Sequence, residues 1–190
     1  MAFQLIAGHP ALDLVNTLDW RFRKEGPEDL LNSYDDVLCF TEQAELLAPE
    51  QTRRLRRTVN ERLGARTLKG CRGLREALAE MFYAPSAAAP KILGGYFRAA
   101  RMQQKLAWKD SRLEWNWASM ESAELPLWVL ALSASELATS DAMDRLRECG
   151  NPECRWLFLD SSKNHTRRWC DMKVCGNRMK ARRFKAHKRN

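Results

Sequence analysis

The sequence lacks the long apolar runs of membrane-spanning chains. Its longest apolar segment, Leu125 to Ala134, is too short to cross a bilayer, which requires about 20 apolar residues. The first residues, Met1 to Ala7, contain neither the basic stretch nor the long apolar run of a secretory signal. We therefore expect a soluble cytoplasmic protein with no membrane partner.

A recognisable catalytic constellation is also lacking. No pairing of a nucleophile with a base stands out, and no metal-ligand set keeps an open position for a substrate. An active site that contains His9, Asp13 and Asn16 would lack both a nucleophile–base pair and a catalytic metal. The sequence therefore predicts that the protein is not an enzyme.

Most of the chain lacks a net positive charge. The first 148 residues hold twenty Lys/Arg and twenty-one Asp/Glu, whereas residues 149–190 hold twelve and three. The formal net charge of +8 thus comes entirely from the last forty-two residues. A basic block joined to a near-neutral globule is typical of a module that binds a polyanion.

That basic block contains four cysteines in two pairs. Four residues separate Cys149 from Cys154, four separate Cys170 from Cys175, and fifteen lie between the pairs. Two short cysteine loops can close a tetrahedral four-thiolate cage around one structural Zn²⁺. The alternatives are two disulfides or buried thiols that share this spacing by chance. Disulfides belong to secreted chains and are disfavoured by the absence of a secretory signal. The sequence therefore predicts one zinc ion per chain.

The residues around these pairs carry the predicted nucleic-acid interface. A strand is expected over residues 156–159 with its turn at 160–164, and a helix from Gly176 to about Lys188. Arg178 lies in the first turn of that helix, and we expect it to neutralise the thiolate cage. Contacts with nucleic acid are predicted for the other cations, Lys163, Arg167, Arg168, Lys173, Lys180, Arg182, Arg183, Lys185 and Arg189. A basic tail with no specific role is the alternative.

A polar cluster is predicted near the start of the chain. His9-Pro10 should open a helix over residues 11–20, because proline favours the first helical position. Asp13, Asn16 and Thr17 share one face of that otherwise apolar helix. They form either a buried hydrogen-bonded network or, together with His9, a pocket for a small ligand.

Helices dominate the prediction for the middle of the chain. A helix begins near Ser33, and a long helical stretch over residues 49–83 is expected to break or bend at Gly64 and Gly70. Alternating apolar residues over 106–117 predict a β-hairpin that turns at Asp110-Ser111. Its tryptophan face is expected to form core, with the stacking of nucleic-acid bases as the alternative. A helix follows over residues 125–138.

Several motifs resemble those of known families. The segments Cys149-Gly-Asn-Pro-Glu-Cys154 and Cys175-Gly-Asn-Arg178, with Trp156, Phe158, Asp160 and Arg168-Trp-Cys170 between them, resemble the bacterial CGNR zinc finger. The opening segment, Gly8-His-Pro-Ala-Leu-Asp-Leu-Val-Asn-Thr17, is similar to the ABATE domain that is usually fused to it. Such proteins are described as candidate stress-induced transcription regulators, and their finger is taken to bind DNA.

These observations together predict a mainly α protein with a small β-hairpin. Residues 1–145 would form a helical, ABATE-like domain for sensing or dimerisation, and residues 146–190 a four-cysteine zinc finger. The expected function is transcription regulation in a stress response through binding of double-stranded DNA. A small-molecule effector of the N-terminal domain and a homodimer are further expected partners. An RNA-binding or ribosome-associated zinc protein is the alternative, since a basic zinc module suits either polymer.

Overall fold

The computed structural model describes residues 2–188, with His187 described by its backbone only. Arg189, one of the predicted nucleic-acid contacts, lies outside the described residues. The chain forms two compact units. The helical unit comprises Met1–Phe3 and Leu31–Ala138, and the finger unit comprises Gln4–Leu30 and Thr139–Asn190. Within the described residues, no helix is both long enough and apolar enough to cross a membrane.

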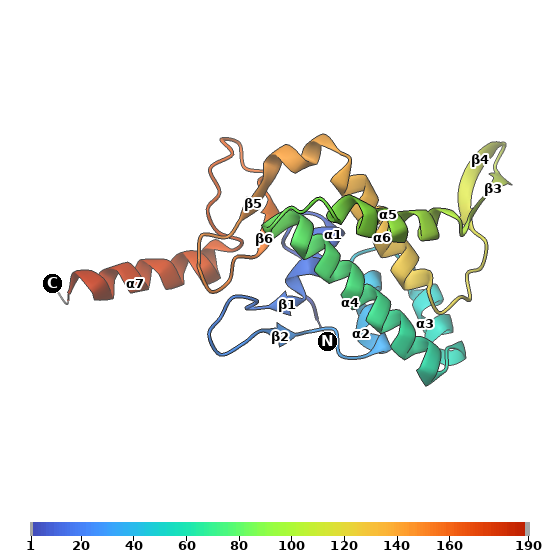
Figure 1. The fold of residues 1–190 in the computed structure, drawn as a ribbon, viewed down its shortest axis with the longest axis horizontal. Coiled ribbons are helices and arrows are strands. Elements are labelled where there is room, and N and C mark those ends of the chain that lie inside the picture. The colour runs from blue at the N-terminus through green and yellow to red at the C-terminus, as the bar shows by residue number, and fades with distance from the viewer. Residues whose placement is uncertain (1, 189–190) are drawn as a thin grey trace. The chain divides into compact units, whose positions relative to one another are not determined.

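The helical unit is organised around an apolar helix, α6. The helices of this unit are α2 Tyr34–Gln43, α3 Pro49–Thr58, α4 Glu61–Tyr83, α5 Ala89–Arg101 and α6 Leu125–Ala138. Helix α6 is buried along most of its length and packs against α2, α4 and α5 (Figure 1). The predicted capping box is present at the start of α2, where Ser33 and Asp36 accept each other's backbone N–H groups.

The break in the stretch over residues 49–83 lies between α3 and α4, so the prediction of breaks at Gly64 and Gly70 is wrong. Asn60 starts α4, because its side chain accepts a hydrogen bond from the Leu63 N–H at 3.0 Å. Both glycines lie inside α4, where neighbouring side chains approach the backbone closely. A Cβ at Gly64 would lie 3.0 Å from Tyr34, and one at Gly70 would lie 2.7 Å from Leu127.

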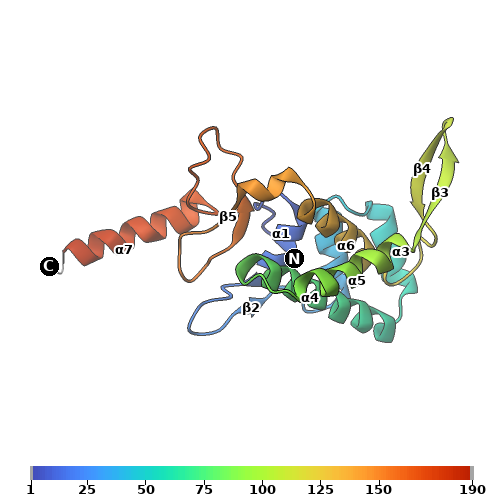
Figure 2. The same ribbon diagram turned by 45° about the horizontal axis from the view of Figure 1, so that its top comes forward.

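The predicted hairpin is confirmed, but its tryptophan face does not form core. Strands β3 Gln104–Lys109 and β4 Arg112–Trp117 are antiparallel, and the hairpin extends away from the helices of its unit (Figures 1 and 2). Trp108 and Trp115 are 75% and 60% exposed. Trp117, at the base of the hairpin, stacks on Trp128, with ring centroids 6.0 Å apart. The alternating pattern predicted the strands correctly but carried no information on whether another element covers them.

The finger unit combines a segment near the start of the chain with the segment that follows α6. Its elements are α1 Pro10–Asn16, β1 Leu18–Asp19, β2 Glu28–Asp29, a 3₁₀ helix Asp141–Arg145, β5 Leu146–Glu148, β6 Leu157–Leu159, a π-helical turn Met172–Gly176 and α7 Asn177–His187. Helix α1 begins at Pro10 as predicted, but ends at Asn16 rather than near Trp20. Helix α1 packs against β6, and Leu12, Leu14 and Phe158 of these two elements are fully buried.

The fold class is therefore mainly α with small antiparallel sheets, as predicted. The predicted division into residues 1–145 and 146–190 concerns which parts fold independently, and it stays a prediction. By packing, the segment Gln4–Leu30 belongs to the same compact unit as the four-cysteine region.

Candidate metal centre and nucleic-acid interface

The four predicted cysteines lie together. The sulfur atoms of Cys149, Cys154, Cys170 and Cys175 are all within 4.8 Å of one another, and all four residues are buried. The Sγ atoms of Cys154 and Cys170 are 3.6 Å apart, and those of Cys170 and Cys175 are 3.7 Å apart. A disulfide would require about 2.05 Å, so these are free thiols.

The spacing of the sulfur atoms fits a tetrahedral zinc site. With Zn–S bonds of about 2.3 Å, tetrahedral geometry places the sulfur atoms about 3.8 Å apart. Four thiolates in a closed tetrahedral site, where no position remains for a substrate, are typical of structural zinc. The protein therefore contains a structural zinc ion, and this buried thiol cluster offers a complete set of ligands for it.

The thiols influence one another's ionisation. Hydrogen bonding between Cys149 and Cys154 lowers the pKa of the Cys149 thiol and raises the pKa of the Cys154 thiol. Four thiolates at this spacing would repel one another strongly, and a divalent cation removes that repulsion and allows all four to lose their protons.

A short hairpin positions the first cysteine pair. Strands β5 and β6 pair antiparallel, and the loop between them carries Cys149 and Cys154. The Cys149 N–H donates to the Trp156 carbonyl at 2.9 Å and closes that loop. The predicted strand at 156–159 is thus present, but residues 160–164 are not its hairpin turn, because its partner strand precedes the first cysteine.

Residues 160–167 instead form a loop around a buried carboxylate. Asp160 is fully buried and accepts hydrogen bonds from the Ser162 N–H and hydroxyl at 2.9 and 2.6 Å and from the Arg167 N–H at 2.9 Å. The hydrogen bonds from Ser162 hold the pKa of Asp160 below its ordinary value. The loop leads to the second cysteine pair, so this carboxylate shapes the segment that delivers Cys170.

The two Cys-Gly-Asn segments meet at Trp169. A Cβ on Gly150 would lie 3.1 Å from the Trp169 ring, and one on Gly176 would lie 3.3 Å from the same ring. Both positions therefore favour glycine. Asn151, which is 1% exposed, donates from its side-chain amide to the Cys175 sulfur at 3.6 Å. This bond links the first loop to a sulfur atom of the second pair, as outer hydrogen bonds commonly do at metal sites.

Two cations anchor α7 to the rest of the finger unit. Arg178, in the first turn, lies over the Trp20 ring with its guanidinium carbon 4.7 Å from the ring centroid. It also lines a cavity of about 190 Å³ that is bordered by Cys154, Cys170 and Cys175. One turn later, Arg182 pairs with Glu153 at 2.6 Å. Arg178 thus lies beside the cysteine cluster, where its predicted supporting role remains a prediction.

Some of the predicted nucleic-acid-binding cations contact other groups of the protein, and others do not. Arg167 donates to the carbonyls of Trp169 and Cys170, and its guanidinium lies over the Phe158 ring. Arg168 lies over the Trp169 ring. The remaining cations are exposed and have no hydrogen-bond or ion-pair partner within the described part of the chain; these are Lys163, Lys173, Lys180, Arg183 and Lys185.

The polar cluster of α1 is hydrogen-bonded within the protein. His9 caps the helix through Nδ1, which accepts the Ala11 N–H at 3.2 Å, and Asp13 accepts the Ala7 N–H at 3.0 Å. Asn16 exchanges two hydrogen bonds with the backbone of Leu157, and the Thr17 hydroxyl donates to the Leu14 carbonyl at 2.6 Å. These contacts are those of a packed network. The ligand pocket at these residues stays a prediction.

Sequence reasoning assigned no role in the site to three residues that position it. Asn151 donates to the Cys175 sulfur, and the Trp20 ring lies under the Arg178 guanidinium. Asp160 accepts the Arg167 N–H and so holds the loop before Cys170. The repeated Cys-Gly-Asn triplet was a usable signal for Asn151. Nothing in the sequence linked Trp20 to Arg178, because their contact depends on tertiary packing.

Comparison with known families agrees with this geometry. The family model of the CGNR zinc finger matches residues 145–188. The family model of ABATE, whose description is "Putative stress-induced transcription regulator", matches residues 8–141. A search of curated proteins found no match to the chain. The ABATE match spans most of the sequence and includes helix α1, and the zinc-finger match includes all four cysteines. The protein therefore belongs to the ABATE family and carries a CGNR zinc finger after the ABATE region.

Proposed function

We propose that the protein is a transcription regulator that binds double-stranded DNA through its finger unit. The observation that carries this proposal is the character of α7. The described helix has five Lys/Arg residues and no acidic residue, and it extends away from the rest of its unit (Figures 1 and 2). Such a helix presents positive charge to a polyanion and has little apolar surface for a protein core.

The cations of α7 fall into two groups with different tasks. Arg178 and Arg182 hold the helix against Trp20 and Glu153. Lys180, Arg183 and Lys185 have no such partner among the described residues and remain available for phosphate groups. The zinc cluster fixes the start of the helix, since Cys175 lies two residues before it. Zinc would thus act structurally, by holding a basic helix in place.

The segments on either side of Cys170 would add to the same interface. Lys163 and Lys173 are exposed and unpaired within the described residues. Arg167, by contrast, is engaged with the backbone of its own loop and supports the interface without needing to touch DNA. Phosphate contacts of this kind give affinity and position, and base contacts would have to supply sequence preference.

Binding competition between two polymers tests this function. Labelled duplex DNA is bound by the zinc-loaded protein and then displaced by unlabelled duplex or by structured RNA of equal length at the same salt concentration. The proposal expects duplex DNA to displace the label at several-fold lower concentration than RNA does. Equal or better displacement by RNA would replace the DNA function with an RNA-binding function.

Zinc dependence supplies the matching control. Removal of zinc with a chelator should abolish duplex binding, because α7 loses the fixed start that presents its cations. Return of zinc should restore binding. Undiminished binding by the metal-free protein would mean that the charge of the tail acts without the finger, which contradicts the proposed role of the zinc.

A further inference from the structure

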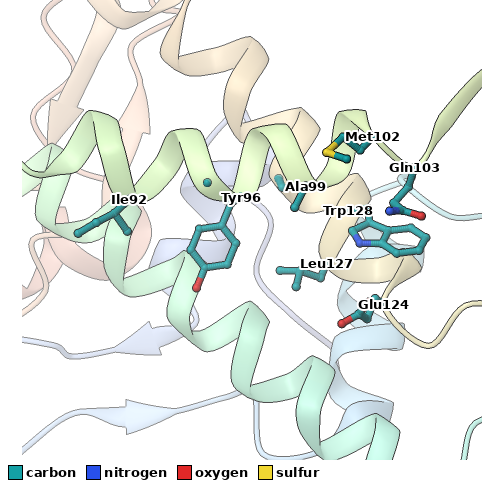
Figure 3. A pocket seen from close by; sticks show the side chains of 10 residues that line it. Ile92, Tyr96, Ala99, Met102, Gln103, Glu124, Leu127 and Trp128 are labelled. Carbon is teal, nitrogen blue, oxygen red and sulfur yellow. The ribbon is translucent and has the colours of Figure 1, made fainter.

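The helical unit contains a cavity of the size of a small-molecule site. It lies between α5 and α6 at the base of the hairpin and has a volume of about 520 Å³ (Figure 3). Sites for small organic ligands usually measure about 300–1,000 Å³ and are mainly apolar. Here Ala99, Leu127 and Trp128 contribute apolar walls, and Tyr96 points from α5 into the same region.

A glycine at the wall of this cavity has no packing reason in the protein itself. In α4, a Cβ at Gly64 would press on Tyr34, and one at Gly73 would lie 2.5 Å from the Tyr96 hydroxyl. At Gly95, in the middle of α5, a Cβ would meet nothing within 4 Å. Glycine inside a helix lowers stability by about 1 kcal/mol relative to alanine. Gly94 is equally open, but only Gly95 lines the cavity, where the missing side chain leaves the helix backbone accessible to a bound molecule.

The cavity also borders an unpaired hydrogen-bond donor. Trp128 is 8% exposed, and its indole N–H has no hydrogen-bond partner among the residues that the structure describes. The nitrogen lies on the edge of the ring that turns toward Leu127 and Tyr96 (Figure 3). The nitrogen is not among the buried polar atoms that lack a partner, so it reaches accessible space, where it can donate a hydrogen bond to water or to another acceptor. An acceptor atom on a bound molecule would fill this role.

The charges near the cavity favour an uncharged ligand. Among the residues that line the cavity, Glu124 is the only one with a carboxylate, and its Oε1 lies 3.6 Å from Nε of Arg66. The charge of that carboxylate is therefore largely balanced inside the protein. The aromatic rings of Tyr96 and Trp128 offer flat surfaces, on which another ring packs favourably.

We propose that this cavity binds an uncharged aromatic molecule that carries a hydrogen-bond acceptor. The ring of the ligand packs between α5 and α6 against the backbone at Gly95, and its acceptor takes the Trp128 N–H. This site is independent of the proposed DNA interface. It also differs from the pocket predicted around His9, which belongs to the finger unit, whereas the cavity residues belong to the helical unit.

The probe for this proposal is prodan, an uncharged naphthalene ketone whose emission shifts to the blue in apolar surroundings. Titration of prodan with the zinc-loaded full chain should give a saturable blue shift. The decisive variant is Gly95→Leu, which fills the cavity and at the same time favours the helix. The matched control is Gly94→Leu, because a Cβ there also meets nothing within 4 Å, yet Gly94 does not line the cavity.

Gly95→Leu should weaken prodan binding at least tenfold, and Gly94→Leu should leave it within twofold of the original protein. Both variants should melt at or above the original temperature, so loss of binding would not reflect unfolding. Trp128→Phe, which keeps a ring but removes the N–H, should weaken binding about two- to tenfold. Absence of a saturable shift, equal binding by Gly95→Leu, or equal loss in both leucine variants would overturn the proposal.

Discussion

The side chain of Asn16 and the backbone of Leu157 hold each other by two hydrogen bonds, although 141 residues separate them in the sequence. The Asn16 amide donates to the Leu157 carbonyl at 2.9 Å, and its oxygen accepts the Leu157 N–H at 3.0 Å. The side chain thus pairs with β6 as a neighbouring strand would. Because β6 begins three residues after Cys154, this contact links the ABATE motif of α1 to the loop that carries the first cysteine pair.

Replacement of Asn16 by alanine should destabilise the finger unit. Asn16→Ala leaves the buried N–H and carbonyl of Leu157 without partners, which we expect to lower the free energy of unfolding by about 1–3 kcal/mol. Urea unfolding of the zinc-loaded protein measures this change. Asn164→Ala is the control, because Asn164 is exposed. Equal stability of the two variants would show that the Asn16 contact does not support the unit.

Loss of any one of the four clustered thiols should remove the zinc. Cys170→Ser is expected to lower the zinc content from one per chain to near zero and to loosen the finger unit, because metal binding energy here is folding energy. Cys39→Ser should keep one zinc, since Cys39 lies outside the cluster. Metal analysis of the purified variants decides this, and a full complement of zinc in Cys170→Ser would refute the assignment of the ligands.

Arg178 should matter for metal retention rather than for DNA contact. A four-thiolate zinc site has a formal charge of about −2, and the guanidinium beside it is held by Trp20. Arg178→Gln should therefore speed zinc release to a chelator several-fold. Arg183→Gln removes the same charge from the same helix and should leave that rate unchanged. If both variants release zinc at the rate of the original protein, Arg178 has no supporting role.

Asp13 should make stability depend on pH in a defined direction. Burial raises its pKa from 3.8 to about 6. A carboxyl group whose pKa is raised by folding stabilises the fold when protonated. Its contribution is fully present below pH 3.8 and is lost as the pH rises through 6.

Asp13→Asn removes this dependence while keeping an oxygen that can accept the Ala7 N–H. The stability of the variant relative to the original protein should rise by about 2–3 kcal/mol between pH 4 and pH 7.5. Urea unfolding of both proteins at several pH values measures the difference, in which any constant effect of the substitution cancels. A difference that does not change with pH would contradict the raised pKa of Asp13.

Local signals made part of this structure predictable from sequence. The spacing of the four cysteines, the proline at the start of α1, and the Ser33–Asp36 capping box each act over a few residues. The structure places all three as expected. The hairpin was also predictable, because alternation and the Asp110-Ser111 turn are local, and both turn residues have positive φ angles of 45° and 67°.

Features that depend on tertiary contact were not predictable. Gly64 and Gly70 were expected to break a helix, but they admit Tyr34 and Leu127 to the backbone of α4. The exposure of Trp108 and Trp115 depends on which element covers the hairpin, and the sequence of the hairpin does not contain that information. The partner of Asn16 was likewise hidden, because an amide bonds to whichever backbone the fold brings beside it.

The salt dependence of duplex binding tests the central claim most directly. Two variants remove equal charge from different surfaces. Lys180→Ala/Arg183→Ala removes two unpaired cations of α7, and Arg57→Ala/Arg62→Ala removes two exposed cations of the helical unit. The slope of log affinity against log salt concentration should become shallower by about 0.9 for each phosphate that the α7 variant no longer neutralises. It should not change in the control variant, and both proteins should keep one zinc per chain. An unchanged slope in the zinc-loaded α7 variant, or an equal reduction in both, would show that this helix is not the element that holds DNA.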